Sequence, residues 1–135
     1  MRSLVRLATA VVLFHLVINM VHGTAHAKLN IMLGPAGTLF VLIVILIFPI
    51  VAAILLWTSR QRLGWILLTL SMTGALLFGL YNHFWQMGPD HVGEQAASTW
   101  ATWFVITAYL LFLSEAAGAL LGLRGLTRER TLAAK

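Results

Sequence analysis

The sequence contains no cysteine, and this absence excludes two kinds of chemistry. Without cysteine the chain can form neither a disulfide bond nor a thiolate ligand for a metal ion. Charge is also scarce, because charged residues make up 10% of the 135 residues and only four residues are acidic. A typical soluble domain has about 25% charged residues. The composition therefore excludes an ordinary soluble domain.

Hydrophobic residues make up 60% of the chain, and the mean hydropathy is +0.91. Four apolar stretches are each long enough to cross about 30 Å of hydrocarbon as a helix. They cover residues 4–27, 36–58, 63–84 and 98–123. The sequence therefore predicts an all-α membrane protein, with residues 1–135 forming a single domain of four transmembrane helices in an antiparallel bundle. Pro49 is expected to kink the second helix.

The nine basic residues lie at the ends of these stretches and not in one patch, which favours a role in membrane topology over nucleic-acid binding. Lys28 alone follows the first stretch. The others are Arg2, Arg6, Arg60, Arg62, Arg124, Arg128, Arg130 and Lys135. This asymmetry predicts cytoplasmic N- and C-termini in a bacterial inner membrane. The expected partner is the lipid bilayer, with no nucleic acid.

The first apolar stretch has an alternative interpretation as a signal peptide. Arg2 and Arg6 precede an apolar run, and Ala25-His26-Ala27 resembles a cleavage site with small residues. The run is long for a signal peptide, and His15 and Asn19 interrupt it. We therefore expect a retained membrane helix.

Polar side chains form one stripe along this first helix. His15, His22 and His26 are separated by seven and four residues, which places them within about 40° of one another around a helix axis. Asn19 falls on the same stripe. Because polar groups are costly in lipid, the stripe is expected to face the bundle interior, a cofactor or a water-filled cavity.

The predicted topology brings further histidines to the outer end of this stripe. His83 and His91 lie at or just beyond the outer end of the third helix, on the same side of the membrane as His22 and His26. Two histidines four residues apart on a helix can bind one ion. The predicted metal ligands are His22, His26, His83 and His91. The alternative is that these histidines are interfacial residues that bind lipid headgroups, water and loop carbonyls.

Acidic residues beside these histidines could carry the chemistry of the site. Asp90 is a candidate oxygen ligand or a partner of a ligating histidine, and Asp90 and Glu94 are candidate catalytic bases. Imidazole without thiolate suits zinc, copper or iron, and the small number of oxygen ligands disfavours calcium and magnesium.

A second polar group is expected near the middle of the membrane. His15 lies roughly 16 Å deeper than His26 and cannot share its ion. Glu115 is similarly deep in the fourth helix, so we expect it to be protonated or paired with His15 or Asn19. These three residues are candidates for cofactor binding or proton movement.

Three functions fit this pattern. The first is a small membrane metalloprotein, in particular a metal-dependent enzyme that acts on a lipid-like or periplasmic substrate. The second is an electron-transfer subunit that binds b-type haem or a quinone, with one axial histidine from each of the first and third helices. The third is a non-catalytic accessory or metal-transport subunit. The small size and the glycine-rich third helix favour a homo-oligomer or a subunit of a membrane complex.

Overall fold

The computed structural model describes residues 1–133, which contain helices and no strand. The first span is α1 (Arg2–Leu29), and the second consists of α2 (Pro35–Phe40), η1 (Val41–Ile47) and α3 (Phe48–Leu56). The third consists of α4 (Gln61–Gly79) and η2 (Leu80–Trp85), and the fourth is α5 (Thr99–Ala133). All four spans are long and apolar enough to cross a membrane. The prediction of an all-helical chain with four helices long and apolar enough to span a membrane is confirmed for residues 1–133.

The helix ends agree with the predicted stretches except at the C-terminal end of the fourth span. The fourth stretch was expected to end near residue 123, whereas α5 continues to Ala133. Leucine, arginine, glutamate and alanine dominate the added segment, and all of them favour helix. Hydropathy alone misses this extension because the added turns are polar.

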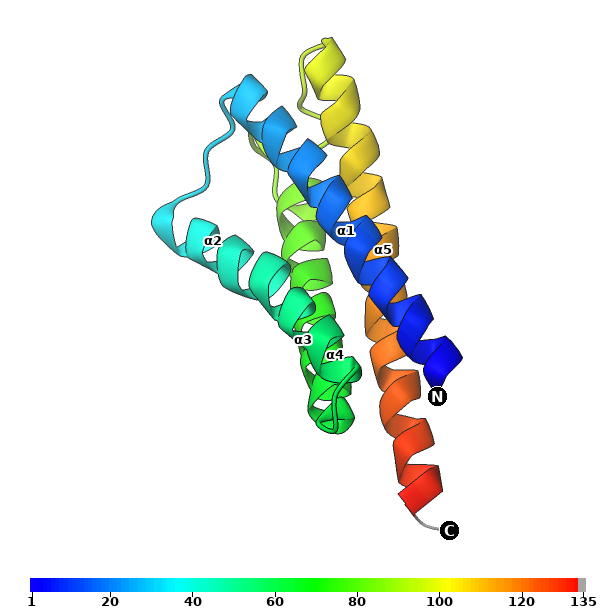
Figure 1. The fold of residues 1–135 in the computed structure, drawn as a ribbon. Helices are drawn as coiled ribbons and strands as arrows, with labels where there is room; N and C mark the ends of the chain where they lie inside the picture. Colours follow the sequence, from blue (N-terminus) through cyan, green and yellow to red (C-terminus); the bar gives the residue numbers. More distant parts are fainter. Residues whose placement is uncertain (134–135) are drawn as a thin grey trace.

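The helices α4 and α5 are the centre of the packing. The helix α5 packs against both α1 and α4, and α3 packs against α4. Figure 1 shows the two chain ends at the same end of the bundle, away from the connections 30–34 and 86–98. The main apolar core lies toward the chain ends and includes Leu4 and Val12 of α1, Leu56 of α3, and Trp65 and Met72 of α4.

The second span diverges from the other helices toward its N-terminal end. Its last part, α3, lies along α4, whereas α2 leads away from the bundle (Figure 1). Its middle part, η1, is a π-helix, in which one extra residue widens each turn. Pro49 is the second residue of α3 and cannot donate a backbone hydrogen bond to Ile45. These features leave space between the second span and the rest of the bundle.

Candidate metal centre

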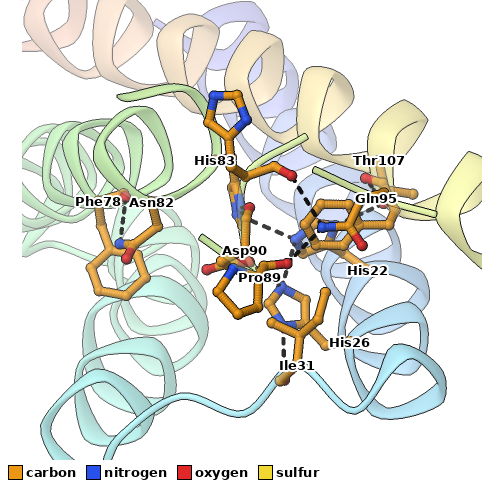
Figure 2. A network of polar contacts seen from close by, with 12 residues as sticks. His22, His26, Ile31, Phe78, Asn82, His83, Pro89, Asp90, Gln95 and Thr107 are labelled. Carbon is orange, nitrogen blue, oxygen red and sulfur yellow. Dashed lines mark hydrogen bonds and ion pairs between the residues drawn. The ribbon is translucent and has the colours of Figure 1, made fainter. Parts of the chain in front are cut away.

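Three buried or half-buried histidines converge between α1 and η2. His22 and His26 lie one turn apart on α1, and His83 lies on η2. The Nε2 atom of His22 is 3.3 Å from Nε2 of His83 and 3.2 Å from Nε2 of His26. Figure 2 shows the three rings directed toward one another. One nitrogen from each ring fits a single metal-binding group, and we call these residues the histidine triad.

The orientation of His22 is fixed by Thr107 on α5. Its Nδ1 atom is 2.8 Å from the Thr107 hydroxyl oxygen. That hydroxyl already donates its proton to a backbone carbonyl, either Trp103 at 2.6 Å or Phe104 at 3.1 Å. Thr107 can therefore only accept from His22. The Nδ1 atom of His22 carries the proton, and its Nε2 atom has a free lone pair.

The orientation of His26 depends on the end of α1. Asn30 adopts a left-handed conformation with φ 56°, which ends the helix and turns the chain back. This turn places the Ile31 carbonyl 3.3 Å from Nδ1 of His26. A carbonyl can only accept a hydrogen bond, so Nδ1 of His26 carries the proton. Its Nε2 atom likewise faces His22 as an acceptor.

The third histidine is oriented by the loop that follows η2. Nδ1 of His83 donates to the backbone carbonyl of Asp90 at 3.0 Å. The Val92 N–H donates back to the His83 carbonyl at 3.0 Å, and Gln95 donates to the Pro89 carbonyl at 2.6 Å (Figure 2). The loop is therefore folded tightly over the triad. Because Nδ1 of His83 donates to the Asp90 carbonyl, Nε2 of His83 is free to accept a hydrogen bond.

With each Nδ1 atom protonated in this way, the three Nε2 atoms present lone pairs to one another. Such an arrangement is repulsive unless a cation lies among the nitrogens. A tetrahedral metal ion bound at about 2.0–2.1 Å separates its ligand nitrogens by about 3.3–3.4 Å. Two of the three separations, 3.2 and 3.3 Å, are close to this value, and all three nitrogens lie within 4.8 Å of one another. Each ligand also donates its other N–H to an oxygen, which is typical of metal-binding histidines.

The carboxylate of Asp90 supplies a negative charge beside the triad. Its Oδ1 atom is 3.2 Å from Nε2 of His26 and 3.1 Å from Nδ1 of His83. Both carboxylate oxygens are shielded from solvent, and neither forms a well-aligned hydrogen bond within residues 1–133. An uncompensated buried carboxylate is costly. A cation bound to the triad would compensate this charge.

Phe104 forms an apolar wall around the three imidazoles. Its ring is stacked on His22 at 4.9 Å between centroids, and it lies 5.2 Å from His26 and 5.5 Å from His83. Phe104 is fully buried. The wall excludes water from one side of the triad and strengthens electrostatic interactions there.

The remaining candidates of this face lie apart from the triad. His91 is not a member of the clustered group found within residues 1–133, and its Nδ1 accepts a hydrogen bond from the Gly93 N–H at 3.0 Å. Glu94 is exposed in the same loop. The predicted metal ligands His22, His26 and His83 are thus brought together, with Asp90 beside them. The interfacial alternative expected bonds to loop carbonyls, and His26 and His83 form them, whereas His22 contacts Thr107 on α5.

The deep polar residues form different contacts from those expected. The ring of His15 lies 3.2 Å from both the Ser114 hydroxyl and the Ile45 carbonyl, and the Asn19 amide donates to the His15 carbonyl at 3.0 Å. Glu115 is 3% exposed. Within residues 1–133 it forms no hydrogen bond or ion pair, so the structure does not show the expected pairing with His15 or Asn19.

The sequence reasoning missed two residues of the site, Thr107 and Phe104. A periodic signal was nevertheless present in the fourth apolar stretch. Phe104, Thr107, Leu111, Ser114 and Gly118 alternate in steps of three and four residues, so they lie on one face of a helix. Two hydroxyls on this face are the partners of His22 and His15.

Comparisons of the chain with protein-family models, with curated proteins and with solved structures found no significant match.

Proposed function

We propose that this chain is an integral membrane metalloprotein that holds a transition metal through His22, His26 and His83 and acts as a metal-dependent enzyme. The convergence of three acceptor nitrogens is the observation that carries this proposal. The Nδ1 atom of each ring contacts an oxygen atom that orients the ring. The Nε2 separations of 3.2 and 3.3 Å suit one ion. Asp90 compensates the charge of the metal.

An enzymatic role is favoured over a purely structural one by the number of ligands. Structural zinc sites are closed by four protein ligands, whereas catalytic sites keep an open position for water or substrate. The triad supplies three nitrogens and borders a cavity of about 330 Å³. Asp90 also borders this cavity and is placed to act as a base toward a group on the metal. The substrate is lipid-like or approaches through the loops.

The chemistry of the ligands favours zinc or iron and also admits copper. Three imidazoles with water suit a hydrolytic zinc ion, and histidines with one carboxylate and open positions suit ferrous iron. The haem alternative finds no support in this geometry. Axial ligation of haem would use two nitrogens on opposite faces, whereas here three nitrogens converge on one point.

The charge pattern supports an orientation for this site. Among residues 1–133, seven basic residues lie toward the helix ends opposite the triad, and Lys28 lies near the triad. By the positive-inside rule, an antiparallel bundle with cytoplasmic termini has its metal centre at the periplasmic face.

Elemental analysis of the purified protein tests the proposal. We expect about one equivalent of zinc, iron or copper in the wild type, loss of metal in His22→Ala and His83→Ala, and retention in His91→Ala. Metal content that is unchanged in both triad variants would overturn the site. A Soret absorption band with stoichiometric iron would instead support haem.

A further inference from the structure

The cavity beside the triad extends from the metal centre toward the middle of the bundle. Its lining comes from all four spans and ends at Glu115 on α5. Between these ends the walls are mostly apolar, with Phe78 on α4, Leu111 and Phe112 on α5, and Val41 on η1; Asn19 and Thr38 are the polar residues of the wall. The cavity therefore combines two polar ends with mainly apolar walls.

Glu115 and the triad approach each other across Gly79. A Cβ atom on Gly79 would lie 3.6 Å from Oε2 of Glu115 and 3.8 Å from Cδ2 of His83. The missing side chain leaves a gap between the carboxyl group and the imidazole that a small polar group would fill. Carboxyl groups inside membrane spans are costly and mark functional sites. Glu115 has no protein partner within residues 1–133, so its partner is expected to be a ligand.

On the side that faces the second span, the cavity opens at the surface of the bundle. Leu42 on η1 lines the cavity and is also 48% exposed. It lies inside an apolar span, so its exposed side faces hydrocarbon. The second span diverges here from the other helices (Figure 1). A molecule dissolved in the bilayer can thus reach the cavity without crossing water.

We propose that the cavity binds a single-chain amphiphile from the bilayer, with its polar head between the triad and Glu115 and its hydrocarbon chain against η1. This proposal rests on the metal site proposed above. A volume of about 330 Å³ is at the low end for ligand pockets. It holds a head group and part of one chain, while the rest of the chain extends past Leu42. The head group is one that coordinates the metal ion held by the triad and donates a hydrogen bond to the carboxyl group of Glu115.

Alkyl hydroxamic acids test this inference, because they bind metal ions and carry N–H and O–H donors. Cobalt-loaded protein in nanodiscs is titrated with dodecanohydroxamic acid or acetohydroxamic acid, and the visible cobalt spectrum reports binding. The substitution Leu42→Trp should weaken the long-chain probe about tenfold relative to wild type and leave the short probe unchanged. Ile47→Trp is the control, since Ile47 is 50% exposed on the same π-helix and does not line the cavity. Equal effects of Leu42→Trp on both probes, or no effect on either, would overturn the inference.

The second set of variants tests the head group. Glu115→Gln and Gly79→Ala should each weaken both probes about tenfold, which corresponds to about 1.4 kcal/mol. Gly79→Ala fills the gap at ordinary contact distances, so it keeps the test valid if Glu115→Gln does not fold. Metal content is measured in every variant. Metal retained with unchanged probe binding overturns the amphiphile inference alone, whereas a wild type that binds no cobalt overturns the metal site and the inference together.

Discussion

The Nε2 atom of His15 on α1 lies 3.2 Å from the backbone carbonyl oxygen of Ile45 in the second span. This carbonyl is the one that Pro49 leaves without its α-helical donor, since proline has no N–H. The Ser114 hydroxyl lies 3.2 Å from the other ring nitrogen. His15 therefore contacts the second and fourth spans from the first.

Removal of this link should destabilise the bundle by a modest amount. We expect His15→Leu to lower the free energy of unfolding by about 1 kcal/mol, in the range of hydrogen bonds between membrane helices. In a Pro49→Ala background the cost should be smaller, because the introduced alanine supplies a backbone donor to the Ile45 carbonyl. Titration of the four proteins with sodium dodecyl sulfate in mixed micelles measures this coupling. An equal cost of His15→Leu in both backgrounds would show that the carbonyl does not depend on His15.

Thr107 contacts His22, one of the proposed metal ligands, so its removal should weaken metal binding. We expect Thr107→Val to lower metal affinity about 10- to 100-fold, the usual effect of losing the partner of a ligating histidine. Competition with a chromophoric chelator measures the affinity. Thr102→Val is the matched control, because Thr102 is exposed on the same helix and its hydroxyl bonds only to the Ser98 carbonyl. Equal affinities of the two variants would contradict the assigned role.

The negative charge of Asp90 can be tested separately from its backbone contact. Asp90→Asn removes the charge but keeps the carbonyl that accepts from Nδ1 of His83. We expect about a 10- to 100-fold loss of metal affinity, because the bound cation loses its buried counter-charge. Glu94→Gln makes the same charge change in an exposed part of the same loop and should have little effect on affinity. A similar loss in both variants would indicate long-range electrostatics and not a specific contact.

Metal retention should also depend steeply on pH. Three imidazoles must be deprotonated to bind the ion, so protons compete with the metal at each ligand. Metal affinity should therefore fall as the pH is lowered, and competition with a chelator at a series of pH values measures the fall. His91→Ala should show the same pH dependence as the wild type. A metal affinity of the folded wild type that does not change with pH would contradict binding through histidines.

Much of the fold could be predicted because hydropathy and helix length set the spans directly. The pairing of His22 with His26 also follows from helical spacing alone. The position of His83 could not be derived in this way, because it depends on the π-helix at the end of the third span and on the loop that folds back through Asp90. The roles of Thr107 and Phe104 required knowing that α5 lies against α1. Spacing within one helix reveals a shared face, but not the helix that this face contacts.

The close contact between α4 and α5 depends on a glycine. A Cβ atom on Gly122 would lie 2.9 Å from the backbone nitrogen of Thr69 and 3.0 Å from its Cα. Backbone atoms cannot move aside as a flexible side chain can, so the two helices must separate in Gly122→Ala. We expect a net loss of about 1–2 kcal/mol of stability, even though alanine favours helix by about 1 kcal/mol. The same unfolding titration measures the loss. Gly37→Ala is the control, because its Cβ would meet Leu33 at an ordinary contact distance of 3.5 Å. Equal or greater stability of Gly122→Ala than of wild type would show that α4 and α5 do not pack this closely.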